Sequence, residues 1–329
     1  MKILYFTDSH YRGTNPQNRL DNFLETQVKK TEEVMEIARN ENVDYILHGG
    51  DLFDRPDIAI SVVSIFAKIF KESPVPIYII SGNHDIYGHN PDTLNRTVMG
   101  LLCDLKVLNL VNDQEIYLKK DVVVKLTGTP YRYGMDLKEN MKRYLIKEDE
   151  KDYDYRIHMT HGFIIDKSFV NTVDYTTVED LYGTDADITL CGHYHLGFKT
   201  VCHEEDGHKK YFINPGALVR LSNSMLEIKR KPKVVIIELT DEIKLKEIYL
   251  KSALAGELVL DRSAMENFKS KRSRDLAFSD MVNSNLNLNK LNIFDMISEI
   301  ARENNLPEKV KEEAIKRIGE AELETKWNI

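Results

Sequence analysis

The sequence predicts a mixed α/β (α+β) fold in which two packed sheets carry helices on their outer faces. Three observations lead to this prediction. Apolar, strand-like runs alternate with segments of helical periodicity in the first third of the chain. Strand-like runs then dominate the middle of the chain. Short clusters of Asp, Asn, His and Gly follow several of these runs, at the position where open α/β sheets bind their ligands.

The first third is predicted to contain three strand–helix units. Its strands are residues 2–7, 43–47 and 75–80, which are rich in Val, Ile, Leu and Tyr. Apolar residues recur at helical spacing over residues 20–38, and Pro56 opens a second helix that runs to Ile69. Each polar cluster of this part therefore lies where a strand ends and the chain turns.

The middle of the chain is predicted to be richer in strands. The expected strands are residues 116–118, 122–126, 155–159, 188–190, 198–201 and 211–213. A helix is expected over residues 136–147. Residues 233–239 and 243–250 are predicted to form a β-hairpin that turns at Asp241 and Glu242.

The character of the sequence changes after this hairpin. Residues 292–301 and 308–318 have helical periodicity, and the first of them carries an apolar stripe. Such a stripe is usually a core face, although an exposed one would dock on a partner. We therefore expect a larger domain over residues 1–240 and a small C-terminal α/β region over 241–329, which caps the first domain or binds a partner.

Composition indicates a soluble globular protein of the cytoplasm. The 329 residues are 42% hydrophobic and 30% charged, and no apolar run is long enough to cross a bilayer, so no membrane association is expected. The three cysteines show no paired spacing and are typical of reduced thiols. The net charge of −8 argues against nucleic-acid binding through an overall basic surface, but it leaves a local basic patch open.

Five short motifs place metal-binding side chains beside small residues. They are Asp8-Ser9-His10, Gly50-Asp51-Leu52-Phe53-Asp54, Gly82-Asn83-His84-Asp85, Thr160-His161-Gly162 and Gly192-His193-Tyr194-His195. The candidate metal ligands in them are Asp8, His10, Asp51, Asn83, His161, His193 and His195. This set is sufficient for two divalent ions, and Asp51 is the expected bridging carboxylate. Mixed carboxylate and imidazole ligands favour Mn, Fe, Zn or Co over Ca or Mg.

A pair of divalent ions predicts hydrolysis of a phosphoester. Such a pair lowers the pKa of bound water from about 15.7 toward about 7, so a hydroxide nucleophile is available at neutral pH. His84 is predicted to donate a proton or to stabilise the transition state, and Asp85 is expected to orient it. Asp54 is predicted to contact one of the metal ligands rather than a metal.

The five motifs resemble those of the calcineurin-like metallophosphoesterase superfamily over residues 1 to about 240. Every usual ligand position of that family has a matching residue here, and Asn214-Pro215-Gly216 is similar to its late motif. The resemblance implies a β-sandwich flanked by helices, which agrees with the two packed sheets predicted above.

Within this superfamily the chain looks most like the SbcD-type DNA repair exonucleases. The segments that carry this likeness are residues 50–56, 81–85, 128–131 and 213–220. The likeness implies a manganese-dependent DNA nuclease of DNA repair and recombination, with 3′ to 5′ exonuclease and single-strand endonuclease activities. It also implies an SbcC-type coiled-coil ATPase as partner and a C-terminal capping domain, and homodimers are common in the family. Archaeal and eukaryotic members usually carry histidine at the position of Asp54. Bacterial SbcD-type members often carry aspartate there, as this chain does.

Substrate contacts are expected from Tyr131 and Arg132, which could stack on a base or sugar, and from Arg220 at the end of a shared motif. A structural role is the alternative for these residues. The basic runs at residues 229–233 and 269–274 either contact phosphates or are solvated surface charge.

Two other functions remain open at this point. The chain could hydrolyse a small nucleotide or another soluble phosphoester, because the metal site would be the same and only the rim would differ. An open groove favours DNA and a closed pocket favours a small substrate. A non-catalytic scaffold of the same fold is the third reading, and the intact ligand set together with His84 argues against it.

Overall fold

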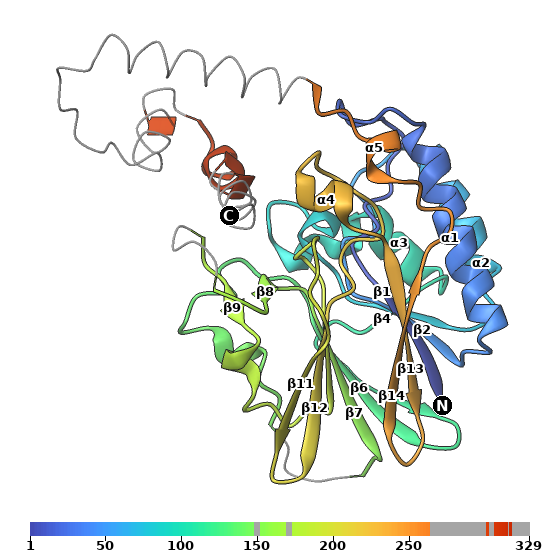
Figure 1. Cartoon of the computed structure of the whole chain (residues 1–329), viewed down its shortest axis with the longest axis vertical. Coiled ribbons are helices and arrows are strands. Elements are labelled where there is room, and N and C mark those ends of the chain that lie inside the picture. The colour runs from blue at the N-terminus through green and yellow to red at the C-terminus, as the bar shows by residue number, and fades with distance from the viewer. Residues whose placement is uncertain (148–151, 169–172, 264–300, 303–305, 315, 318–329) are drawn as a thin grey trace.

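Two six-stranded mixed sheets form the centre of the structure, a computed structural model that describes residues 1–147, 152–168, 173–263, 301–302, 306–314 and 316–317 (Figure 1). The first sheet has the order β14 (Ile243–Tyr249), β13 (Lys233–Leu239), β1 (Lys2–Phe6), β2 (Tyr45–His48), β3 (Ile77–Ile79) and β4 (Asn109–Leu110). The second has the order β11 (Val201–Glu205), β12 (His208–Ile213), β10 (Ile188–Cys191), β7 (Tyr155–Thr160), β6 (Val123–Thr129) and β5 (Glu115–Lys119). The short strands β8 (Ile164–Ile165) and β9 (Thr176–Thr177) pair separately.

The helices lie outside these sheets. They are α1 (Phe23–Asn40), α2 (Ile60–Lys71), α3 (Val98–Asp104), α4 (Met225–Lys229) and α5 (Gly256–Val259). Figure 1 shows α1 and α2 on the outer face of the first sheet. The mixed architecture of two sheets with flanking helices confirms the predicted fold class.

Both sheets contain four neighbouring parallel strands together with antiparallel strands at an edge. Strands β1 to β4 run parallel, while β13 is antiparallel to both β1 and β14. In the second sheet β12, β10, β7 and β6 run parallel, while β11 and β5 are antiparallel edges. Because parallel strands end on the same side of a sheet, the loops that follow them gather at one rim.

Successive apolar side chains on the central strands point to opposite faces of the sheet, and they therefore contribute to two separate hydrophobic cores. Ile3 and Tyr5 of β1 face the interior between the sheets, where they join Ile157 of the second sheet. Leu4 and Phe6 face the other way and pack with α1 and α2. This is the period-two pattern of a strand that is buried on both faces.

Helix α2 supports the loop that follows β1. The ring of Phe66 stacks on Tyr11 with ring centroids 3.7 Å apart and an interplanar angle of 21°. Both side chains are fully buried, and Tyr11 is the next residue after His10. The position of His10 therefore depends on the packing of α2.

The predicted helix over residues 136–147 is wrong. This segment consists of turns with one 3-10 turn at Met141–Arg143. The Asp136 carboxylate accepts hydrogen bonds from the Tyr144 hydroxyl at 2.7 Å, from the Phe163 N–H at 3.0 Å and from the Thr176 hydroxyl at 2.9 Å. The bonds from Phe163 and Thr176 tie the segment to the β8–β9 pair, and they override its helical periodicity.

The other predicted elements agree with the structure within a few residues, except that β11 begins where the predicted strand 198–201 ends. The predicted hairpin is β13 and β14, so the proposed division at residue 240 falls within it and stays a prediction.

Residues 269–274 and 292–300 lie outside the described residues. Residues 308–314 and 316–317 are helical as expected, and we call them the C-terminal helical segment. Within the described residues, no helix combines the length and hydrophobicity that a membrane span requires.

We predict that Phe66→Ala lowers the free energy of unfolding by about 3–5 kcal/mol, because it removes a buried ring and leaves a cavity beside Tyr11. The measurement is urea denaturation followed by circular dichroism. Ile60→Ala is the control on the same helix, because Ile60 is 84% exposed, and its effect should stay within about 0.5 kcal/mol. Equal stability of the two variants would contradict the assigned role of Phe66.

Candidate metal centre

All of the predicted metal ligands lie on loops at one rim of the two sheets. Asp8 and His10 follow β1, Asp51 follows β2, Asn83 follows β3, His161 follows β7, and His193 and His195 follow β10. Their ligand atoms form two groups, in each of which the atoms lie within 4.8 Å of one another. The first group contains Asp8, His10, Asp51 and His195, and the second contains Asp51, His161 and His193. Asp51 belongs to both, which is the position of a bridging ligand.

One oxygen of the Asp51 carboxylate accepts a backbone hydrogen bond, and the other faces the candidate ligand histidines. Oδ1 accepts the N–H of His84 at 2.8 Å. Oδ2 lies 3.6 Å from His10 Nε2 and 3.3 Å from His161 Nε2. Asp51 Oδ2, His161 Nε2 and Asn83 Oδ1 are buried without a hydrogen-bond partner. Since buried polar atoms are rarely left unpaired, this set of oxygen and nitrogen donors fits divalent cations.

Asp8 connects the loops of the two sheets. Both of its oxygens accept the N–H of His193 at 3.1 Å, and its Oδ2 also accepts the Thr7 hydroxyl at 2.7 Å. Its Oδ1 lies 3.6 Å from His195 Nε2 and 3.9 Å from His10 Nε2. A single carboxylate thus fixes the backbone after β10 and faces two imidazoles of the first group.

The ligand loops hold an unusual backbone conformation. Asp8, His10, Asp51 and His193 have φ angles of 52°, 45°, 53° and 69°, in the left-handed region. Such a conformation costs a residue with a side chain about 1–2 kcal/mol. Strain of this kind is concentrated at functional sites, where the surrounding contacts impose it.

Gly192 allows three of the loops to approach one another. A Cβ atom at this position would lie 2.5 Å from the Gly49 carbonyl oxygen and 2.8 Å from His161 Nδ1. These distances are too short for any side chain. The glycine of the last motif is therefore required by the contact between the loops after β2, β7 and β10.

Burial sets the charge of most of the imidazoles. It lowers the pKa of His10, His193 and His195 well below the ordinary range, which leaves them in the neutral form that binds metal. His161 differs, because the Asp51 carboxylate outweighs the effect of burial and raises the pKa of His161 to about 9. Burial raises the pKa of Asp8 to about 6. A cation that binds at His161 would therefore displace a proton.

His84 is oriented by the backbone of Asp54. Its Nδ1 lies 2.8 Å from the Asp54 carbonyl oxygen, which can only accept, so Nδ1 carries the proton. Burial alone would lower the pKa of His84, but the Asp51 charge and the Asp54 carbonyl raise it. The Asp54 carboxylate pairs with Arg12 Nη1 at 2.9 Å and lies 4.0 Å from Nδ1 of the candidate ligand His10.

The prediction that Asp85 orients His84 needs correction. The Asp85 carboxylate accepts the backbone N–H groups of Gly82 at 2.9 Å, Leu52 at 3.1 Å and Phe53 at 3.3 Å. It therefore caps its own 3-10 turn and fixes the loop that carries Asp51. The orienting group that the structure places at His84 is a carbonyl, which a motif cannot reveal.

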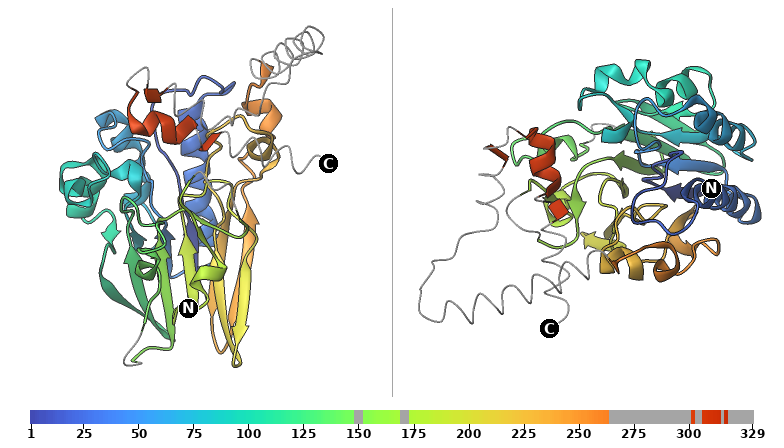
Figure 2. Two further views of the ribbon diagram at one scale, coloured as in Figure 1. Left: turned by 90° about the vertical axis from the view of Figure 1, so that its left-hand side faces the viewer. Right: turned by 90° about the horizontal axis from the view of Figure 1, so that it is seen from above.

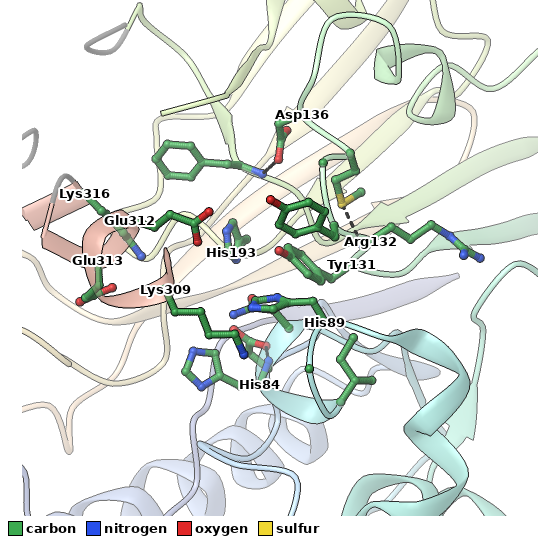
Figure 3. Close-up of a pocket in the computed structure, with 18 of the residues that line it drawn as sticks. His84, His89, Tyr131, Arg132, Asp136, His193, Lys309, Glu312, Glu313 and Lys316 are labelled. Carbon is green, nitrogen blue, oxygen red and sulfur yellow. Dashed lines mark hydrogen bonds between the residues drawn. The ribbon is translucent and has the colours of Figure 1, made fainter. Parts of the chain in front are cut away.

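A cavity of about 780 Å³ opens over the candidate ligands (Figure 3). Tyr131 lines it, as predicted for a substrate contact, with its ring 5.6 Å from the ring of His193. Arg132 also lines it, but its guanidinium pairs with Asp113 at 2.6 Å. His89, which lies outside the five motifs, lines the same cavity with its ring 5.4 Å from that of Tyr131.

Arg220 lies away from this cavity, contrary to its predicted role as a substrate contact. It is buried, and its guanidinium donates to the carbonyl oxygens of Arg230 at 2.7 and 3.1 Å and of Leu254 at 2.8 Å. These bonds tie the loop after β12 to α4 and to the segment before α5. The arginine of the shared motif is thus structural here.

We predict that Arg220→Ala lowers the free energy of unfolding by about 3 kcal/mol, since a hydrogen bond from a charged group contributes about 1.5–3 kcal/mol. Its metal content per folded chain should equal that of the wild type. Urea denaturation and elemental analysis measure the two quantities. A variant of unchanged stability that binds a phosphodiester less tightly would instead support a contact between Arg220 and substrate.

We predict that Asp51→Asn removes at least half of the bound divalent metal, because the amide cannot serve as an anionic ligand to two ions. The measurement is Mn²⁺ content by elemental analysis after dialysis against a trace of the ion. Asp113→Asn is the control, because this exposed carboxylate lies outside both ligand groups and should leave the content unchanged. Full metal content in Asp51→Asn would exclude a bridging role.

Two curated proteins are similar to parts of this chain. The DNA double-strand break repair protein Mre11 of Methanococcus maripaludis is 27% identical over 172 residues, which cover 49% of this chain and 43% of that protein. The double-strand break repair protein MRE11 of Encephalitozoon cuniculi is 24% identical over 308 residues, which cover 81% of this chain and 50% of that protein. The chain thus spans half or less of the length of these curated relatives.

A solved structure and a family model complete the comparison. The crystal structure of TT1561 of Thermus thermophilus is 12% identical, with a TM-score of 0.46, and the match covers 75% of this chain and 98% of that one. The model of the family described as calcineurin-like phosphoesterase matches residues 1–197, which include every candidate metal ligand. Because this match covers more than half of the sequence, the chain belongs to the calcineurin-like phosphoesterase family.

Proposed function

We propose that this protein is a phosphodiesterase that depends on two metal ions and hydrolyses DNA, in the manner of an SbcD-type nuclease. The observation that carries the proposal is the position of Asp51, which belongs to both groups of ligand atoms and lies beside His84. The relatives named as double-strand break repair proteins support DNA as the substrate class.

The chain's own residues have distinct roles in this proposal. Asp8, His10, Asp51 and His195 would hold one ion, and Asp51, Asn83, His161 and His193 the other. The bound ions, with Mn²⁺ as the proposed species and Fe, Zn or Co as alternatives, supply positive charge for the phosphate and activate water.

His84 is proposed as the proton donor. Because its Nδ1 donates to the Asp54 carbonyl, Nε2 is the nitrogen that remains for substrate. The raised pKa of His84 favours the protonated ring that a general acid requires. Asp54 thus acts on the reaction through the orientation of His84.

Aromatic side chains on the cavity wall support a nucleotide substrate. Tyr131, Tyr133, His89 and Phe163 all line the cavity, and Tyr133 is 70% exposed. A base can stack on such rings without regard to its identity, with a contribution of about 1–3 kcal/mol per base. We propose that Tyr131 and Tyr133 make these contacts, while Arg132 holds its loop through Asp113.

A small nucleotide or another soluble phosphoester is the second candidate substrate. The observation that favours it is the cavity volume of about 780 Å³, which lies within the range of about 300–1,000 Å³ typical of small-molecule sites. Both candidates use the same metal ligands and His84.

We further propose that the chain works in DNA repair with an SbcC-type coiled-coil ATPase. The support is the likeness of its motifs and the names of its relatives. A homodimer and a C-terminal capping or partner-binding region over residues 241–329 belong to the same proposal.

We predict that His84→Gln lowers kcat at least about 100-fold on end-labelled single-stranded DNA with Mn²⁺, because general acid catalysis contributes about 10²–10⁴-fold. The loss should be smaller on bis-p-nitrophenyl phosphate, because its p-nitrophenolate leaving group departs without a proton. Metal content should stay at the wild-type level, and removal of metal by a chelator should abolish activity on both substrates. His208→Gln, on the distant strand β12, is the control.

The two substrates separate the candidate functions. If the wild type cleaves DNA and His84→Gln does not, the nuclease proposal stands. If the wild type cleaves the small diester and leaves DNA intact, the second candidate replaces it. Equal rates for His84→Gln and the wild type on DNA would remove the proposed role of His84.

A further inference from the structure

The C-terminal helical segment forms part of the wall of the metal-site cavity. Figure 2 shows this segment, in red, above the rim where the strands end. Its residues that line the cavity are Glu308, Lys309, Lys311, Glu312, Glu313 and Lys316. Figure 3 shows Lys309 extending from the segment toward His84, and Glu312 extending toward His193. Residues that are more than a hundred positions from the last metal ligand thus share its cavity.

Two cations of this segment form ion pairs within its described residues, and two others do not. Lys311 Nζ lies 2.7 Å from Glu308 Oε1, and Arg317 Nε lies 2.7 Å from Glu313 Oε1. Lys309 and Lys316 have no ion pair with any residue that the structure describes, and both line the cavity. Lys311 also lines the cavity, but Glu308 neutralises it, so among the described residues of this segment Lys309 and Lys316 are the unpaired cations in the cavity wall.

Lys309 and Lys316 line the same cavity as the candidate metal ligands His193 and His195. Two cations beside ligands for two divalent ions repel the bound metal, unless an anion lies between them. Glu312 lies on the same face, between the two lysines, and offsets only part of their charge.

The spacing of the two lysines fits a strand with several phosphates. They are seven residues apart, which is two helical turns, so they lie on one face and about 10 Å apart along the axis. That distance is about three nucleotide rises of 3.4 Å, so one strand can present a different phosphate to each lysine.

We propose that Lys309 and Lys316 bind phosphates of an oligonucleotide strand next to the scissile phosphate, so that the C-terminal helical segment is a substrate-binding wall of the nuclease site. This inference rests on the proposed function, and it defines the substrate as a strand longer than one diester. Neither lysine takes part in the hydrolysis itself.

The test uses the full chain with Mn²⁺ and a fluorescent single-stranded oligonucleotide with phosphorothioate linkages that resist cleavage. The variant Lys309→Ala/Lys316→Ala is compared with Lys244→Ala/Lys246→Ala, which removes the same charge from paired cations on β14, outside the cavity. Fluorescence anisotropy gives Kd over a range of salt concentrations. Hydrolysis of bis-p-nitrophenyl phosphate is measured in parallel.

We expect the first variant to bind the oligonucleotide at least tenfold more weakly. The slope of log K against log salt should fall by about 1.4, since each phosphate contact on a single strand contributes about 0.7. The control variant should keep the wild-type slope, and Glu312→Gln should bind more tightly. All variants should hydrolyse the small diester within twofold of the wild type, because it does not reach the lysines.

Three results would overturn the inference. The first is equal Kd and slope for the two double variants. The second is tighter binding and faster DNA cleavage by Lys309→Ala/Lys316→Ala, which would make the segment an inhibitory cover. The third is wild-type protein that hydrolyses the small diester but neither binds nor cleaves DNA, in which case the proposed nuclease function fails first and the inference fails with it.

Discussion

Three buried carboxylates hold the metal-site loops together by accepting backbone N–H groups from neighbouring loops. Asp8 accepts from the loop after β10, and Asp51 accepts from the 3-10 turn after β3. Asp85 accepts from the loop after β2 as well as from its own turn. A hydrogen bond to a charged group is stronger than one between neutral groups, and an unpaired buried carboxylate would be costly. The loops therefore fix one another's positions.

This arrangement explains how the chain maintains a strained site. Four candidate ligands have a left-handed backbone, and their total cost of several kcal/mol must be offset by other contacts. The carboxylates that impose this geometry are themselves ligands or neighbours of ligands. The same groups thus shape the backbone and supply the donors for the cations.

The sequence was sufficient to predict that the candidate ligands gather at one rim, because each of them follows a strand and the carboxyl ends of parallel strands meet there. It was insufficient wherever a role depends on a partner that is distant in the chain. Asp85 and Arg220 bond to backbone groups that no motif identifies, and Asp136 draws its segment out of a helix through Phe163 and Thr176.

The residues that were missed share the same cause. His89 follows Gly88 in a turn outside any motif, and only the fold brings it to Tyr131. Lys309 and Lys316 lie on a helical segment that the sequence predicts, but local periodicity does not say which surface that segment covers. Their spacing of seven residues predicts that both lysines lie on one helix face, but only the structure shows that this face borders the candidate metal ligands.

The position of β1 has a consequence for biosynthesis. This strand lies between β2 and β13, so one of its edges stays open until residues 233–239 have been made. The loop after β1 likewise waits for His193 to satisfy Asp8. Since closure over such a separation comes late in synthesis, nascent chains that lack residues 233–239 cannot complete the sheet that supports the site. Assembly of the candidate metal centre therefore waits, by topology alone, until most of the chain has been made.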